Sequence, residues 1–151
     1  MNSNETDNKK TFSFLRIVHI LFLVSIPIYI SVIFQLKLLD VHTPFHLSIP
    51  SLHIIEAVLA FFAIYDLLLG YYWPKILRKF RTTNKPKISI FSIHIHRIAN
   101  FVAIAIYGLV LAILGGAWYI WIWFFVVSAA ALILTFPTDE RISNWTQEQP
   151  K

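Results

Sequence analysis

Four apolar segments constrain the fold of this chain more than any other feature of its sequence. They cover about residues 12–34, 51–73, 98–114 and 118–136. A helix needs about 20 mostly apolar residues to cross a hydrocarbon core roughly 30 Å thick, and each of these segments falls in the usual range for a span. The sequence therefore predicts four membrane spans in a chain of 151 residues.

The composition supports membrane spans and favours helices over strands. Hydrophobic residues make up 57% of the chain and charged residues only 14%, whereas soluble domains carry about 25% charged residues. Lipid cannot hydrogen-bond the backbone, so long continuous apolar runs form helices, while barrel strands would be short and alternating. We expect an all-α, integral membrane four-helix bundle over residues 12–136, with polar tails at residues 1–11 and 137–151.

The positions of lysine and arginine predict the orientation of the bundle. Cations in short loops near spans stay on the cytoplasmic side. We therefore expect the basic loop 74–97 and both termini in the cytoplasm, the Gly115-Gly116 turn outside, and the chain in a bacterial inner membrane. The cations expected to contact anionic lipid headgroups or a partner protein are Lys75, Arg78, Lys79, Arg81, Lys85, Lys87 and Arg97.

Aromatic residues and one proline give two local predictions. Tryptophan and tyrosine favour the membrane interfaces, so Trp118, Tyr119, Trp121 and Trp123 are expected to form an outer aromatic belt. Pro27 lies inside the first span. Because proline lacks a backbone N–H and clashes with the preceding turn, it is expected to kink that helix.

Polar residues inside the spans are the main candidates for function, because ionisable groups are costly in a membrane. Asp66 lies about 10 Å inside the cytoplasmic end of the second span, at 1.5 Å per residue, and His19 has a similar depth on the first. We expect Arg16, His19, Asp66 and Asn100 to form an intramembrane polar cluster, with Tyr65 or Tyr107 nearby. Such a cluster can hold helices together, relay protons or ions, or bind a ligand.

Histidines on two helices suggest a haem site. Haem b in a helical bundle is held by two histidines from different helices. His19 and either His94 or His96 would approach from the same side of the membrane, so these residues are the candidate haem ligands. The position of His94 and His96 beside Arg97 also fits an ordinary contact with lipid headgroups.

A second histidine group lies in the predicted outer loop and the start of the second span. His42, His46 and His53, with Glu56, supply imidazole and carboxylate groups that suit zinc, copper or iron. Pro44 lies between the first two histidines and disfavours a regular helix there. These four residues are the candidate metal ligands on the outer side.

No catalytic motif accompanies these residues. The chain has no cysteine, and it has no nucleophile elbow, no phosphate-binding glycine loop and no His-Glu-x-x-His motif. We expect a non-enzymatic accessory or anchoring subunit of a membrane complex, in contact with lipid and with a membrane partner or a second copy. The alternatives are a small b-type cytochrome or haem-bearing respiratory anchor, and a proton or solute pathway centred on Asp66. Nucleic-acid binding is not expected, because topology accounts for the basic loop.

Residues 103–116 contain Ala-Ile-Tyr-Gly-Leu-Val-Leu-Ala followed by Leu-Gly-Gly. This segment resembles the second half of rotary-ATPase proteolipid (c) subunits, and it is similar to the last hairpin of small uncharacterised bacterial four-span proteins that end in a pair like Phe136-Pro137. The resemblance implies a proteolipid-like helical hairpin. The proton-carrying carboxylate of proteolipids corresponds to Val102 here, so that role does not carry over.

Overall fold

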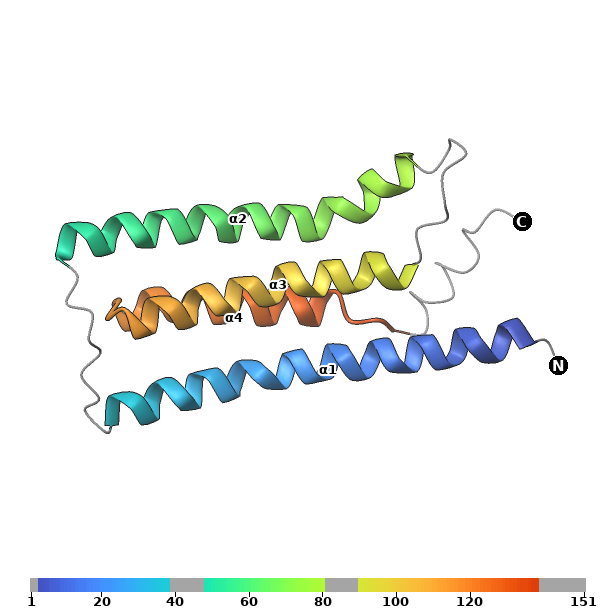
Figure 1. Ribbon diagram of the computed structural model, residues 1–151, viewed down its shortest axis with the longest axis horizontal. Coiled ribbons are helices and arrows are strands. Elements are labelled where there is room, and N and C mark those ends of the chain that lie inside the picture. Colours follow the sequence, from blue (N-terminus) through green and yellow to red (C-terminus); the bar gives the residue numbers. More distant parts are fainter. Residues whose placement is uncertain (1–2, 39–47, 81–89, 139–151) are drawn as a thin grey trace.

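The computed structural model contains four α-helices that run up and down in turn (Figure 1). The structure describes residues 3–38, 48–80 and 90–138, with side chains for residues 12–38, 48–73 and 92–138. This described part is helical apart from its connections, which confirms the predicted all-α class. The helices are α1 (Ser3–Leu38), α2 (Ile49–Phe80), α3 (Ile90–Ile113) and α4 (Trp118–Leu134).

Three of the helices are long and apolar enough to cross a membrane. The apolar stretches are Phe12–Leu38 in α1, Ile49–Trp73 in α2 and Ser92–Ile113 in α3. α4 is also apolar but has only 17 residues, at the short end of the range for a span. The structure thus supports a membrane protein with three long candidate spans, and the crossing of the membrane by α4 stays a prediction.

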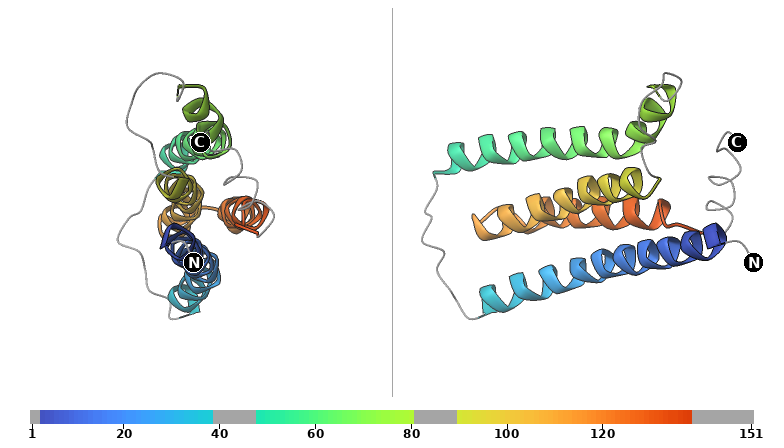
Figure 2. Two further views of the ribbon diagram at one scale, coloured as in Figure 1. Left: turned by 90° about the vertical axis from the view of Figure 1, so that its right-hand side faces the viewer. Right: turned by 45° about the vertical axis from the view of Figure 1, so that its right-hand side comes forward.

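α3 is the central helix of the fold. It packs against α2, α4 and α1, and α4 also packs against α1. In the view along the helices, α2 and α1 lie on opposite sides of α3, and α4 lies beside this row (Figure 2). The four helices therefore form an open arrangement rather than a closed ring, and α2 makes its extended contacts with α3.

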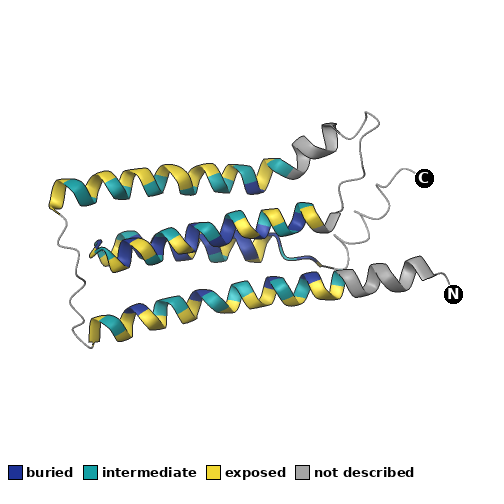
Figure 3. Cartoon of the chain, viewed as in Figure 1, coloured by how far each residue is buried: buried dark blue, intermediate teal, exposed yellow. Residues whose placement is uncertain are grey.

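The core lies between α1, α3 and α4 (Figure 3). Between residues 49 and 73, by contrast, Gly70 is the one buried position of α2. Large apolar side chains therefore face outwards along most of α2, as expected where lipid or another protein replaces water. The largest fully buried apolar side chains include Leu15 of α1, Ile98, Phe101, Ile104 and Leu111 of α3, and Trp121, Phe125 and Leu132 of α4.

Glycines shape the hairpin of α3 and α4. A Cβ atom at Gly108 would lie 2.9 Å from both the Phe124 Cβ and the Trp121 carbonyl oxygen, so the two helices approach too closely for any side chain there. Gly115 has a positive φ of 85°, and the Gly116 N–H donates to the Leu111 carbonyl oxygen at 2.8 Å. This pairing is the Schellman arrangement that ends a helix, and it turns the chain directly into α4.

The structure changes one local prediction and leaves another open. Trp121 is 2% exposed, so its assignment to the outer aromatic belt was wrong, whereas Trp118 and Trp123 are each 64% exposed. The reason is helical spacing, because Trp121 lies on the side of α4 that faces α3. α1 continues through Pro27 without ending, which is tolerated in apolar helices when neighbouring groups satisfy the freed backbone.

Candidate functional site

The predicted polar cluster is distributed over both sides of α3. Asp66 lies on α2, half-buried, and its Oδ2 accepts a hydrogen bond of 2.7 Å from the Tyr107 hydroxyl of α3. His19 lies on α1 and is fully buried against α3 and α4. The structure therefore brings Asp66 together with Tyr107, one of its two expected neighbours, and places His19 in a separate group.

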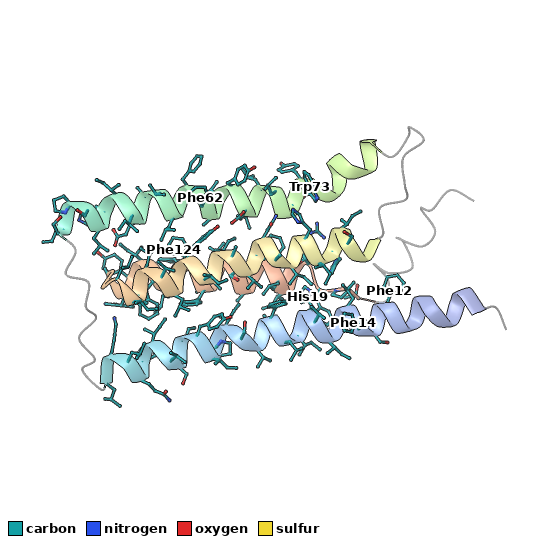
Figure 4. All side chains as sticks on the ribbon, in the orientation of Figure 1. Phe12, Phe14, His19, Phe62, Trp73 and Phe124 are labelled. Atoms are coloured by element: carbon teal, nitrogen blue, oxygen red, sulfur yellow. The ribbon has the colours of Figure 1, made fainter. Side chains whose placement is uncertain are left out.

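His19 is the centre of this second group (Figure 4). Its Nε2 donates a hydrogen bond of 2.7 Å to the Leu132 carbonyl oxygen, since a carbonyl can only accept. Its ring centroid lies 5.7 Å from that of His94, which is itself 3% exposed. The Phe136 ring approaches His19 edge-on at 5.2 Å. We call His19 and His94 the histidine pair.

The other ring nitrogen of His19 is less well satisfied. His19 Nδ1 is buried and has no hydrogen-bond partner within the described residues. Because Nε2 carries the proton that goes to Leu132, Nδ1 of the neutral ring presents a lone pair. A buried polar atom without a partner is uncommon and calls for an explanation in terms of strain, a ligand or chemistry.

Two arginines lie near the histidine pair for reasons of helical spacing. Arg16 precedes His19 by three residues and Arg97 follows His94 by three, so each arginine projects from nearly the same side of its helix as its histidine. The Arg16 Nε donates to the Pro137 carbonyl oxygen at 3.0 Å. The Arg97 Nε donates to the Gly70 carbonyl oxygen at 2.8 Å, which links α3 to α2.

The C-terminal end of α4 accounts for the contacts of His19 and Arg16. The last carbonyls of a helix have no partner within the helix and carry partial negative charge. α4 stops at Leu134, and its terminal turn and the residues just after it lie beside α1. His19 and Arg16 donate to carbonyls of this region, at Leu132 and Pro137. The polar groups of α1 thus satisfy the backbone where α4 ends.

Asn100 belongs to the side of α3 that carries Tyr107, two helical turns away. Its Nδ2 is buried and finds no hydrogen-bond acceptor in the described part of the chain. In the described part of the chain Asp66 bonds to Tyr107, and no hydrogen bond joins Asp66 to Asn100. The sequence predicted that Asp66 and Asn100 lie at a similar depth. Asp66 instead contacts Tyr107, which follows Asn100 by seven residues along α3.

The candidate haem ligands are now distinguishable by position. His94 is buried beside His19, whereas His96 is exposed and its ring lies 5.4 Å from that of Trp73. The structure thus selects His94 rather than His96 as the neighbour of His19. In this arrangement the Nε2 of His19 is already engaged by Leu132.

The predicted outer metal ligands fall partly outside the described residues. His53 and Glu56 interact on the first turns of α2, with 3.0 Å between Nδ1 and Oε2. His42 and His46 lie outside the described residues. Over residues 3–38, 48–80 and 90–138, no group of three or more histidine, aspartate or glutamate side chains is placed to hold a metal ion.

The basic residues of the loop 74–97 are also described only in part. Arg81, Lys85 and Lys87 lie outside the described residues. The backbone of α2 includes the positions of three further cations whose side chains are not described, namely Lys75, Arg78 and Lys79. The contact of this loop with lipid or a partner stays a prediction.

Two contacts were not foreseen from the sequence. The Lys37 Nζ lies 5.2 Å from the centre of the Trp121 ring, a cation–π contact between the ends of α1 and α4. The Ser128 hydroxyl donates to the Phe101 carbonyl oxygen at 2.7 Å and joins α4 to α3. A serine within an apolar run is a weak signal for such a contact, since polar side chains often link membrane helices.

The Asp66 and Tyr107 pair gives a direct test of the contact between α2 and α3. We expect Asp66→Asn and Tyr107→Phe to be non-additive in the free energy of unfolding, with a coupling of about 0.6 to 1.7 kcal/mol, the range for interhelical hydrogen bonds in membranes. Unfolding in mixed micelles would measure the single and double variants. Tyr65→Phe, an exposed tyrosine next to Asp66, is the matched control. Strict additivity would contradict the hydrogen bond.

Comparisons with protein-family models, with curated proteins and with solved structures find no match. Two features of the structure bear on function. They are the histidine pair next to the C-terminal end of α4 and the outward apolar surface of α2.

Proposed function

We propose that this protein is a multi-pass membrane protein that serves as a non-enzymatic accessory or anchoring subunit of a membrane complex. The observation that carries the proposal is the packing of α2. Within residues 49–73 it buries one residue, Gly70, and makes its extended contacts with α3. Because α2 contributes so few buried residues to the core of the protein, most of its surface is available to lipid and to another protein.

The outward surface of α2 is apolar and rich in large side chains. Phe61 is 67% exposed, and Ile64, Tyr65 and Leu68 are each at least half exposed. Membrane helices associate through van der Waals packing of such surfaces and through interhelical polar contacts. We propose that a helix of a partner subunit packs on this side, while α1, α3 and α4 form the stable core that anchors it.

We further propose that the spans lie in a bacterial inner membrane, with the loop 74–97 and the termini in the cytoplasm. The distribution of lysine and arginine supports this orientation. The ends of α2 and α4 and the beginnings of α1 and α3 lie at one end of the bundle (Figure 1). The basic loop joins α2 to α3 at this end. Its cations would contact anionic headgroups, each worth about 1 kcal/mol near a charged surface.

Site-specific photo-crosslinking tests the proposed partner surface. We expect a photoreactive phenylalanine analogue at Phe61, in cells that make the protein at native level, to give one discrete protein adduct on illumination. The reason is that Phe61 lies on the outward side of α2. Denaturing electrophoresis and mass spectrometry of the adduct would measure its size and identity.

The matched control is the same analogue at Leu67, which packs against the core. This site should give only intramolecular products with no increase in mass. Lipid adducts alone at Phe61, Ile64 and Leu68 would show that lipid covers this surface and would refute the anchoring role. The haem-bearing anchor and the proton pathway remain alternative predictions, and an absorption spectrum with dithionite is the direct check of the first.

A further inference from the structure

The histidine pair has the features of a small metal site rather than of simple helix packing. A histidine that binds a metal through one ring nitrogen usually donates its other N–H to a carbonyl or carboxylate, which fixes the orientation of the ring. His19 shows this arrangement, because its Nε2 donates to the Leu132 carbonyl oxygen. Its Nδ1 is left as a buried lone pair with no hydrogen-bond partner among the described residues.

The spacing of the two rings also fits a shared ion. A metal bound by an imidazole lies about 2 Å from the nitrogen, so two imidazoles on one ion have centroids about 6 Å apart. The centroids of His19 and His94 are 5.7 Å apart and their planes are inclined by 37°. Both side chains are almost completely buried, at 0% and 3% exposure.

The donor set restricts the kind of ion. Within the described ranges no third histidine, aspartate or glutamate joins the pair. The ion must therefore be one that binds stably with two protein ligands. Zinc normally takes four. The two ligands are neutral, and Arg16 and Arg97 each lie three residues from one of them. A divalent ion would add two charges to this positive, apolar surrounding, whereas a monovalent ion adds one.

We propose that His19 and His94 bind one monovalent copper ion (Cu⁺) through Nδ1 of His19 and a ring nitrogen of His94. Imidazole suits copper, and the d¹⁰ ion Cu⁺ accepts two nitrogen ligands in a nearly linear arrangement. Haem iron fits this geometry less well, because the carbon that carries the side chain is next to Nδ1 and would press against a porphyrin. The half-buried ring of Phe136 packs edge-on against His19.

Copper titration of the purified full-length protein in detergent tests the site. Under anaerobic conditions with ascorbate, the protein should remove one equivalent of Cu⁺ per chain from a coloured bicinchoninate complex. We expect His19→Gln and His94→Gln each to weaken this binding by more than about tenfold, since even outer-shell changes cost that much. Glutamine at position 19 can still donate to the Leu132 carbonyl oxygen, so the variant is designed to keep the fold.

The matched control is His96→Gln, because His96 is an exposed histidine on the same helix. It should bind copper as the unchanged protein does, and circular dichroism should show equal helix content in all variants. X-ray absorption should show two nitrogen ligands. Equal copper binding in all three variants would overturn the proposal, as would preferential binding of Zn²⁺. A haem spectrum lost in both His19→Gln and His94→Gln would assign the pair to haem iron instead.

Discussion

Replacing Gly108 with leucine is expected to destabilise the protein by about 3 kcal/mol, the upper part of the range for overpacking. A Cβ at this position would already lie 2.9 Å from the Phe124 Cβ and 2.9 Å from a backbone oxygen of Trp121. Backbone cannot rotate away as a side chain can, so α3 and α4 must separate. Unfolding by sodium dodecyl sulfate in mixed micelles, followed by circular dichroism, would measure the loss.

The control for this change is Ala130→Leu, at an exposed position of α4. It adds a similar volume on the outer surface and should leave the unfolding midpoint nearly unchanged. Gly108→Ala is a second informative variant, because alanine favours helices by about 1 kcal/mol over glycine. If Gly108→Ala lowers stability in spite of the higher helix propensity of alanine, the loss comes from the close approach of α3 and α4. Equal stability of Gly108→Leu and Ala130→Leu would show that the hairpin does not pack as described.

Replacing Trp121 with alanine is expected to cost about 3 to 5 kcal/mol, the range for removing a large buried aromatic side chain. Trp121 is 2% exposed, and its ring lies 6.1 Å from that of Phe125. The Lys37 Nζ lies over the Trp121 ring, 5.2 Å from its centre. Truncation leaves a cavity between α3 and α4 and removes the cation–π contact with α1. The same unfolding measurement applies.

Trp123→Ala is the control for Trp121→Ala. The two residues have the same type and lie on the same helix, but Trp123 is 64% exposed. Its loss should change the unfolding midpoint little, because lipid or detergent takes the place of the ring. If both tryptophans cost the same, the inward position of Trp121 would be refuted. A further variant, Lys37→Met, separates the contribution of the cation–π contact, about 0.5 to 2 kcal/mol, from that of the packing of Trp121.

The helices themselves could be predicted from the sequence because their cause is local. Apolar runs of this length must satisfy their backbone internally, and Gly115-Gly116 provides the positive φ that ends α3. Three of the described helices run well past the predicted apolar segments, since α1 begins at Ser3, α2 ends at Phe80 and α3 begins at Ile90. A helix can continue past an apolar segment into polar residues without a distinct sequence signal. The hydrophobic pattern therefore does not fix where such a helix begins or ends.

The neighbours of each polar residue could not be obtained in the same way. Depth along a span is fixed by residue count, and it placed Arg16, His19, Asp66 and Asn100 at comparable levels. The direction in which each side chain points depends on how the helices are arranged around α3. Because α1 and α2 pack on opposite sides of α3, Asp66 meets Tyr107 and His19 meets His94.

The sequence by itself determined the helical class, the number of apolar segments and the turn at Gly115, since these follow from backbone hydrogen bonding in an apolar solvent and from local sterics. Only the tertiary structure decided that Trp121 is buried while Trp123 is not, that the carbonyls at the end of α4 receive His19 and Arg16, and that α2 stays outside the core. The physical reason is that lipid is as apolar as the side chains, so hydrophobicity does not distinguish inward from outward faces. Close packing at Gly108 and a few hydrogen bonds make that choice.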